Sequence, residues 1–331
     1  MAATDIGIDL GTASIVVYLR GKGIVVKEPA LVAYDKDKDR VMAVGEEARQ
    51  MVGRTPGNIM AIRPLKEGVV SDYMIMEKML RYFIQKAMGR RGFLKPRIVI
   101  CLPTGVTTVE RRAVEEATFQ AGAREVTLVD EPMAAAIGAQ IDVTRPNGNM
   151  VVDIGGGITD IAVISLGGIV SSASIKVAGD QFNEAIIRYV RKRYGLFIGE
   201  QTAEMAKIRI GTAGKRPRQE TMDIKGRNVI TGLPKMVRLT SEDVRIALQE
   251  PVRQILQSIH HVMERTLPEF AADITSRGII LAGGGAKLHG LEEVISESTG
   301  VPVILAEHPS SVVALGTGRY LETMAVLEKG F

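Results

Sequence analysis

Two aspartates, Asp9 and Asp153, each precede a glycine-containing turn at the end of an apolar run, in "IGIDLGTA" and "MVVDIGGG". Such turns expose consecutive backbone N–H groups, and two of them facing each other would hold a polyphosphate from both sides. Two carboxylates beside phosphates need a hard cation between them. Mg²⁺ fits because it binds one or two carboxylates, mostly through retained waters, and bridges phosphate oxygens. The pair therefore predicts a magnesium-dependent polyphosphate site.

A third glycine cluster supports this interpretation. Gly283, Gly284 and Gly285 follow the apolar run "GIILA" and precede a helical pattern, and the first N–H groups of a helix attract anions. The alternative for each cluster is a turn that needs glycine for a positive φ. The chain has no Gly-x4-Gly-Lys-Ser/Thr motif and no Gly-x-Gly-x-x-Gly after its first strand, so the familiar nucleotide motifs are not used.

The elements that must position these residues form a repeat. Asp9 and Asp153 are 144 residues apart (153 minus 9), and each lies in a strand, glycine-rich turn, strand pattern. The repeat predicts two related halves that each begin with a β-hairpin. Helical patterns separate the hairpins, so we expect an α/β fold with helices on both faces of its sheets.

Three helix starts can be placed. Thr107 and Glu110 form a capping box, and Asp180 can cap a second helix. Ser241 begins a third helix, which we expect to be bent or interrupted at Pro251.

The bulk composition is that of an ordinary globular protein. The 331 residues are 46% hydrophobic and 24% charged, which suits two domains or one large lobed domain. The chain has neither an apolar run long enough for a membrane span nor a secretion signal at its start, so we expect a cytosolic protein. Its single cysteine, Cys101, lies in an apolar run and is expected to pack in a strand.

The charge pattern argues against a nucleic-acid partner, and the spacing of the histidines argues against a zinc site. The net charge of +4 comes from local clusters, whereas aromatic residues are 4% and tryptophan is absent. Proteins that bind single-stranded nucleic acid combine basic clusters with stacking aromatics, so no nucleic-acid partner is expected. The four histidines do not have the spacing of zinc ligands.

Several segments together resemble one family. "IGIDLGTA", "GRTPGNIMAIRPLKEGV", "DEPMAAAIGA", "MVVDIGGG", "VAGD", "LAGGGAKL" and "VALGTG" are similar to the MreB family of bacterial actin-like proteins, along essentially the whole chain. The resemblance implies an actin-like fold: two duplicated lobes of mixed sheet with helices, four subdomains, and ATP with Mg²⁺ in the central cleft. The implied boundaries are residues 1–32, 67–144 and 316–331 for subdomain IA, 33–66 for IB, 145–181 and 242–315 for IIA, and 182–241 for IIB.

The resemblance also implies roles for single residues. Asp9 and Asp153 would hold the waters of Mg²⁺, and Glu204 and Lys207 would form a wall around the adenosine, although an i, i+3 surface pair explains these two equally well. The implied first phosphate loop is Gly11, Thr12 and Ala13, the second is Gly155, Gly156 and Gly157, and the adenosine motif is Gly283, Gly284 and Gly285.

Glu131 matches the family residue that positions or activates the attacking water. Phosphoryl transfer to water needs little beyond orientation and charge neutralisation, so the role is chemically reasonable. The alternative is an acidic residue before Pro132 that favours a helix N-terminus. One position departs from the family: Ile158 follows the glycines where the family usually has threonine, and it cannot hydrogen-bond a water. Thr159 should point to the opposite face, so we expect slow hydrolysis.

The family polymerises, and the resemblance implies a membrane-associated cytoskeletal ATPase that forms antiparallel double filaments and organises cell-wall elongation to set rod shape. Its partners would be further copies of itself, the anionic inner face of the cytoplasmic membrane, and membrane-bound elongation proteins of the RodZ, MreC and MreD type. In "GRRGFLKPR", Phe93 and Leu94 lie among cations and could insert into lipid. The alternative is a loop whose Phe93 packs into its own domain.

Two other functions share the fold. A small-molecule kinase needs an acceptor pocket with a base near the γ-phosphate, and a chaperone-type ATPase needs a substrate domain after "VALGTG", for which the remaining residues leave no room. The kinase is the principal alternative.

Overall fold

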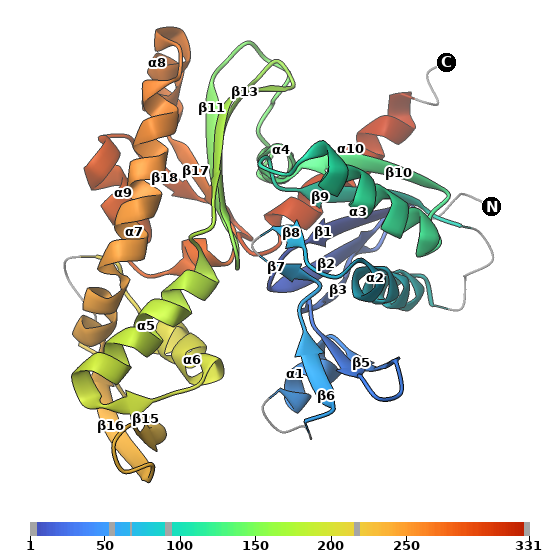
Figure 1. The fold of residues 1–331 in the computed structure, drawn as a ribbon. Coiled ribbons are helices and arrows are strands. Elements are labelled where there is room, and N and C mark those ends of the chain that lie inside the picture. The colour runs from blue at the N-terminus through green and yellow to red at the C-terminus, as the bar shows by residue number, and fades with distance from the viewer. Residues whose placement is uncertain (1–4, 53–56, 67, 90–94, 215–218, 328–331) are drawn as a thin grey trace.

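Two five-stranded sheets form the centres of two lobes, which stand side by side in Figure 1. The computed structural model describes residues 5–52, 57–66, 68–89, 95–214 and 219–327. The sheet of lobe I has the order β10-β9-β1-β2-β3, and the sheet of lobe II has the order β18-β17-β11-β12-β13. The strands of lobe I are β1 (Asp5–Leu10), β2 (Ser14–Leu19), β3 (Gly23–Pro29), β9 (Arg97–Leu102) and β10 (Glu125–Asp130). The strands of lobe II are β11 (Asn149–Ile154), β12 (Thr159–Ser165), β13 (Gly168–Ile175), β17 (Ile279–Ala282) and β18 (Val303–Leu305).

The two sheets are built in the same way. In each, three strands form an antiparallel meander, a fourth strand pairs in parallel with the first strand of that meander, and a fifth pairs in parallel with the fourth. Asp9 pairs with Val16 and Asp153 pairs with Asp160, so each acidic residue lies near the end of its hairpin. The predicted duplication is therefore confirmed.

Each lobe is extended at one end by a three-stranded sheet, and both of these small sheets lie at the bottom of Figure 1. They are β5-β4-β6 in lobe I and β14-β15-β16 in lobe II, and a two-stranded sheet, β7-β8, lies at the base of the former. We keep the four subdomain boundaries as a proposal that this division of the sheets supports. The strands are β4 (Val32–Asp35), β5 (Arg40–Val44), β6 (Ile59–Ile62), β7 (Leu65–Lys66), β8 (Val69–Val70), β14 (Leu196–Phe197), β15 (Thr221–Asn228) and β16 (Pro234–Thr240).

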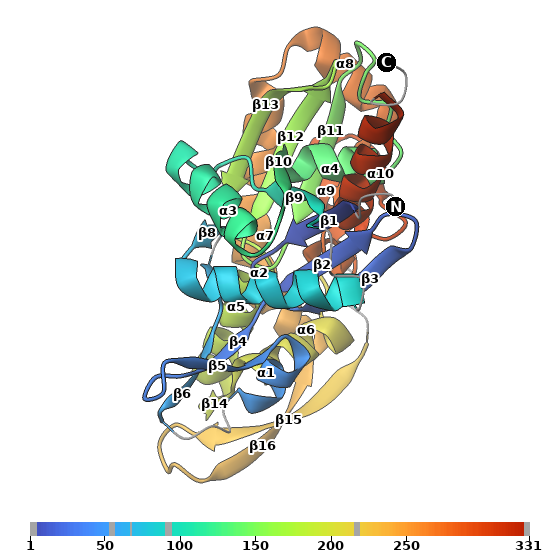
Figure 2. The same cartoon turned by 90° about the vertical axis from the view of Figure 1, so that its right-hand side faces the viewer.

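Helices cover both faces of the large sheets, as predicted (Figure 2). Helices α2 and α3 pack on one face of the lobe I sheet, and α5 and α7 pack on the lobe II sheet. The helices are α1 (Glu46–Met51), α2 (Tyr73–Met88), α3 (Thr108–Gln120), α4 (Glu131–Gly138), α5 (Gly179–Tyr194), α6 (Glu200–Ile210), α7 (Ser241–Glu264), α8 (Pro268–Arg277), α9 (Leu291–Thr299) and α10 (Val312–Leu327), with a short 3₁₀ helix at Gly285–Lys287.

The helix starts test the capping predictions. The capping box of Thr107 and Glu110 is present. Helix α7 begins at Ser241 and runs without interruption through Pro251, so of the two expectations the interruption is wrong, and a bend there stays a prediction. The prediction that Asp180 caps α5 is also wrong: Ala178 occupies the cap position, and Asp180 lies in the first turn with its carboxylate bonded to Arg63.

Helices α4 and α10 join the lobes, because a shared core packs them against residues of both large sheets. Glycines allow their close approach: a Cβ on Gly138 would overlap the backbone of Val312, and one on Gly316 would overlap the backbone of Ala134. Cys101 is fully buried in this shared core, where burial raises the pKa of its thiol well above the usual value. Within the described part of the chain, no helix is both long and apolar enough to cross a membrane.

Candidate functional site

A cavity of about 550 Å³ lies between the lobes. The three glycine clusters, the two aspartates, Glu131, Glu204 and Lys207 all line it, although they come from distant parts of the sequence. The structure therefore brings together every predicted site residue that it describes. Phe93 and Leu94 lie outside the described residues.

The two phosphate turns have matching backbone geometry. The N–H of Gly11 donates to the carbonyl of Ser14 (3.1 Å), and the N–H of Gly155 donates to the carbonyl of Ile158 (2.9 Å). No acceptor among the described residues takes the N–H groups that follow in either turn, which belong to Thr12, Ala13, Gly156 and Gly157. Free N–H groups that border one cavity are suited to an anion.

The turns touch each other across the lobes. A Cβ on Gly156 would overlap the Cβ of Ala13, and one on Gly157 would lie 2.7 Å from Thr12 Oγ1. Both distances are too short for a real side chain. The second turn therefore needs glycine so that the two hairpins can converge.

The third glycine cluster packs against the end of β11. Gly283 has φ +86°, and a Cβ there would overlap the carboxylate of Asp153 and the backbone of Ile154. Gly284 has open space where a Cβ would be, so its lack of a side chain leaves room in the cavity.

The carboxylates of the cavity carry strongly shifted pKa values. Burial raises the pKa of Asp9 to about 7, and the nearby Lys27 ammonium partly offsets this rise. Burial, followed by the charges of Asp9 and Asp160, raises the pKa of Asp153 well above its usual range. Such a cluster is unfavourable when ionised, and a bound cation would relieve it.

Glu131 is the first residue of α4 and is 9% exposed. Burial raises its pKa well above the usual range, and the neighbouring carboxylates of Asp160, Asp153 and Asp9 raise it further. Asp160 is fully buried and accepts a hydrogen bond from Thr104 Oγ1 (2.8 Å). A carboxyl with a raised pKa at a cavity wall is a candidate general base.

The residues present fit a magnesium–nucleotide complex. The free N–H groups suit phosphates, and Asp9 and Asp153 supply the oxygen ligands that Mg²⁺ prefers. Among the described residues, no group of three or more His, Cys, Asp or Glu could hold a metal ion alone. Two carboxylates with waters and phosphates are a usual arrangement for Mg²⁺.

Comparison with known proteins identifies the family of the chain. The family model described as "MreB/Mbl protein" matches residues 3–329. The chain belongs to the MreB/Mbl family. The cell shape-determining protein Mbl of Bacillus subtilis is 52% identical over 99% of both chains. The cell shape-determining protein MreB of Escherichia coli is 49% identical over 97% of this chain and 94% of that one.

Solved structures agree with this assignment. MreB5 of Spiroplasma citri bound to AMPPNP has a TM-score of 0.93 and 34% identity, with full coverage of both chains. The ADP-bound form has the same TM-score and 36% identity, covering 98% of this chain and 97% of that one. A double helical filament of MamK, at 23% identity and a TM-score of 0.83, shares the fold. The fold is therefore actin-like.

Ile158, where the resemblance implies a threonine, borders the cavity of this MreB/Mbl chain. Ile158 is 7% exposed, and its side chain lies beside Gly68. The hydroxyl of Thr159 donates to the carbonyl of Val177 (2.7 Å) and does not line the cavity. The prediction that Thr159 points away from the site is confirmed, and it cannot replace a threonine at position 158.

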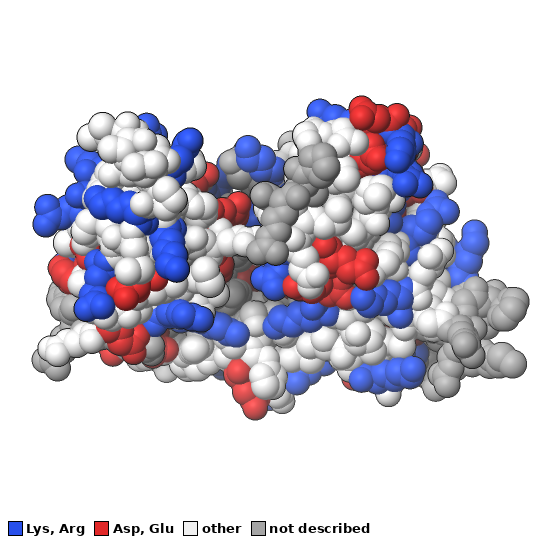
Figure 3. All heavy atoms as spheres, turned by 90° about the horizontal axis from the view of Figure 1, so that it is seen from below, with Lys and Arg blue, Asp and Glu red and all other residues white. Residues whose placement is uncertain are grey.

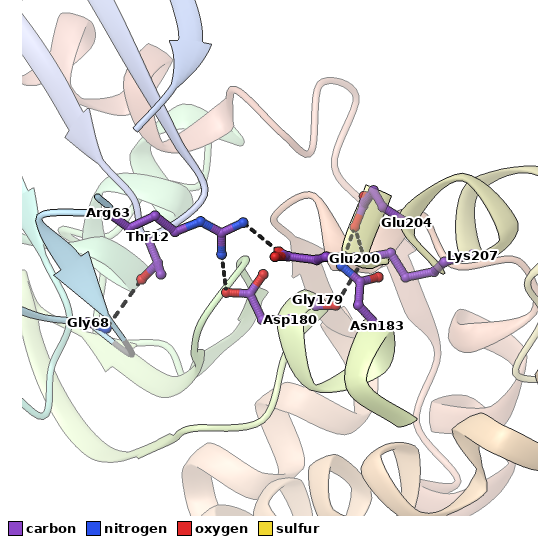
Figure 4. A network of polar contacts seen from close by, with 9 residues as sticks. All are labelled: Thr12, Arg63, Gly68, Gly179, Asp180, Asn183, Glu200, Glu204 and Lys207. Carbon is purple, nitrogen blue, oxygen red and sulfur yellow. Dashed lines mark hydrogen bonds and ion pairs between the residues drawn. The ribbon is translucent and has the colours of Figure 1, made fainter. Parts of the chain in front are cut away.

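Glu204 and Lys207 form the i, i+3 ion pair (2.6 Å) and also line the cavity. Their role as a wall around the adenosine stays a prediction. Lys207 Nζ donates to the carbonyl of Gly179 (3.0 Å), and Asn183 Nδ2 donates to Glu204 Oε2 (2.7 Å). These contacts fix the pair at one wall of the cavity (Figure 4).

Several residues at the site were not predicted to take part in it. Asp180 and Lys287 line the cavity. Asp160 neighbours Glu131, and its charge raises the pKa of that carboxyl. The signal for Asp160 was available, because a hairpin of "DIGGGITD" places its two aspartates opposite each other. Lys27 gave no such signal: its proximity to Asp9 depends on how β3 packs beside the hairpin.

Proposed function

We propose that this chain is an actin-like cytoskeletal ATPase that binds ATP with Mg²⁺ in the interlobe cavity. The observation that carries the proposal is the convergence of two matching glycine turns, one from each lobe, whose free N–H groups border the same cavity as Asp9 and Asp153. The nucleotide-bound structures of Spiroplasma citri MreB5, a related protein, support it.

Each residue then has a defined task. The N–H groups of residues 12, 13, 156 and 157 bind phosphate oxygens, and Asp9 and Asp153 hold the waters of the cation. Mg²⁺, when bound, neutralises charge on the phosphates. Glu131 orients the attacking water and accepts its proton, for which a raised pKa makes its carboxylate a stronger base. Ile158 leaves that water without a hydroxyl partner, so hydrolysis is slow.

Self-assembly into filaments, arranged as antiparallel pairs, is the second part of the proposal. The turn between β15 and β16 exposes apolar side chains: Ile230 is 93% exposed and Leu233 is 65% exposed. Figure 3, viewed from that end, shows lysine and arginine side chains on both lobes, including lobe II around the tip. The last turn of α5, which precedes β14, carries Arg191, Lys192 and Arg193. An apolar tip with a basic surround is suited to a protein partner, here a second copy.

Attachment to the inner face of the cytoplasmic membrane through Phe93 and Leu94 is the third part. The flanking Arg90, Arg91 and Lys95 in the sequence support binding to anionic lipid. Arg97, the fourth cation of the segment, is buried at the start of β9 and paired with Asp5 (3.1 Å), so it is not available to lipid. On the membrane, the filaments would work with elongation proteins of the RodZ, MreC and MreD type and direct wall synthesis to set rod shape. The names of the Mbl and MreB relatives, cell shape-determining proteins, support this role.

One experiment tests the central proposal. The purified protein is incubated with ATP and Mg²⁺ on anionic liposomes, released phosphate is measured, and the lipid surface is imaged by electron microscopy. We expect paired filaments on the lipid and slow phosphate release. Transfer of phosphate to added sugars instead of water would support the kinase alternative, and no nucleotide binding would overturn both.

The membrane contact has its own test. Replacing Phe93 and Leu94 together by alanine should abolish co-sedimentation with anionic liposomes while leaving ATP binding unchanged. Full liposome binding by the double variant would refute this contact.

A further inference from the structure

Arg63 connects the two lobes at the edge of the cavity (Figure 4). It follows β6 in lobe I, and its guanidinium contacts two carboxylates of lobe II: Nη1 lies 3.0 Å from Asp180 Oδ2, and Nη2 lies 2.6 Å from Glu200 Oε1. Asp180 is in the first turn of α5, and Glu200 begins α6. A single side chain therefore ties lobe I to the starts of two helices in lobe II.

The backbone of Arg63 is anchored in its own lobe. Ser71 Oγ donates to the carbonyl of Arg63 (2.9 Å), and the N–H of Ser71 donates to the carbonyl of Pro64 (2.8 Å). Because the base of the side chain is held in this way, opening of the lobes must break its contacts with Asp180 and Glu200.

Asp180 connects the ion pair to the second phosphate turn. Its N–H donates to the carbonyl of Gly156 (2.7 Å), and the N–H of Gly179 donates to the carbonyl of Gly155 (3.2 Å). The carbonyls of the turn thus face α5, while the N–H groups of Gly156 and Gly157 remain free beside the cavity. Arg63 holds the residue that fixes this arrangement.

The first phosphate turn is tied to the same stretch of chain. The N–H of Gly68, five residues after Arg63, donates to Thr12 Oγ1 (3.2 Å). Both turns are therefore bonded to the segment that follows β6, one directly and the other through Asp180. These contacts hold the two turns at their present spacing.

We infer that Arg63 is a positioning residue that latches the lobes around the cavity and slows the release of a bound nucleoside polyphosphate. The inference rests on the proposed nucleotide site. A ligand that touches both turns can leave only when the lobes separate, and the latch lowers the population of the open state. Arg63 does not line the cavity, so it acts through Asp180 and Glu200 and not by contacting the ligand.

The test is the dissociation rate of a fluorescent ADP analogue with Mg²⁺, measured by chasing with unlabelled ATP. Arg63→Ala should release the analogue about tenfold faster, equivalent to about 1.4 kcal/mol. The association rate and the melting temperature without ligand should change much less. Arg63→Lys keeps the charge but cannot contact both carboxylates in the same fork geometry, so its rate should be intermediate.

Two further variants sharpen the result. Arg49→Ala removes a similar bidentate pair, to Glu46 (2.8 and 2.9 Å), which lies on the surface of the same small lobe extension and should leave release unchanged. Glu200→Gln removes one arm of the latch without touching the cavity lining and should give a partial effect.

The outcomes separate the two proposals. Absence of analogue binding by the unmodified protein would contradict the nucleotide site itself. If the unmodified protein binds the analogue, and both Arg63→Ala and Glu200→Gln release it at the rate of the unmodified protein, the nucleotide site stands and the latch is overturned. A loss of thermal stability in Arg63→Ala with unchanged release would assign Arg63 a structural role only.

Discussion

Gly157 of lobe II lies so close to Thr12 of lobe I that a Cβ on the glycine would be 2.7 Å from the threonine hydroxyl oxygen. The contact brings the N–H groups of both turns to one cavity. The spacing of the turns depends on the absence of a single carbon atom.

Gly157→Ala should therefore push the turns apart and weaken ATP binding by about tenfold or more. Isothermal calorimetry with MgATP measures the change. Gly199→Ala is the matched control, because Gly199 has open space for a Cβ and an ordinary φ of −84°. Equal affinities for Gly157→Ala and the control would show that the turns do not grip the ligand together.

Glu131→Gln keeps the shape of the side chain but removes its ability to accept a proton. We expect phosphate release to fall by about a hundredfold, while nucleotide affinity stays within about twofold. Single-turnover phosphate release, together with affinity from fluorescence titration, separates the two effects. A variant that still hydrolyses ATP at the original rate would remove Glu131 from the reaction.

Ile158→Thr should raise the rate of phosphate release, because it restores a hydroxyl at the cavity wall. Ile158→Val is the control, since valine has nearly the shape of threonine without the hydrogen-bonding group. Removing part of a buried side chain lowers stability by about 1 kcal/mol in either variant. Turnover of the threonine variant no higher than that of the valine variant, with assembly intact, would contradict the role given to position 158.

Asp9 predicts a pH dependence of stability in the protein without metal. Its pKa rises from 3.8 to about 7 on folding. The folded state therefore holds a proton that the unfolded chain releases, and the contribution of Asp9 to stability falls as pH rises through this window and is least favourable above pH 7. Asp9→Asn should raise the melting temperature by about 5 °C at pH 8 and much less at pH 4. Calorimetric melting curves in EDTA measure this difference, and an equal shift at both pH values would contradict the raised pKa.

The exposed tip between β15 and β16 predicts an assembly defect. Replacing Ile230 and Leu233 together by aspartate puts charge where a second copy would bury apolar surface. Sedimentation with ATP should show loss of polymer, whereas nucleotide affinity and melting temperature should remain those of the original chain. Normal polymer from this variant would exclude the tip from the filament contact.

Much of the site could be predicted because it is repeated. The duplicated "IDLGTA" and "VDIGGG" turns indicated two converging hairpins, and the observed sheets have the same strand order around each of them. The capping box at Thr107 depends on residues three apart, so local sequence was enough to find it.

Contacts between distant segments could not be predicted in this way. Asp180 has the residue type and position of a helix cap, yet its carboxylate bonds Arg63, which is 117 residues away. Pro251 marks a helix break in local terms, but the packing of buried residues along α7 keeps that helix continuous. Lys27 reaches Asp9 only through the packing of neighbouring strands. In each case tertiary structure decided between options that the local sequence left equal.

The buried position of Cys101 has a practical use. With this thiol shielded in the shared core and held in the protonated form, the chain offers maleimide dyes no accessible thiol. A cysteine introduced on either side of the latch could therefore be labelled selectively without first removing the natural one. Opening and closing of the lobes could then be followed by energy transfer in otherwise unmodified molecules.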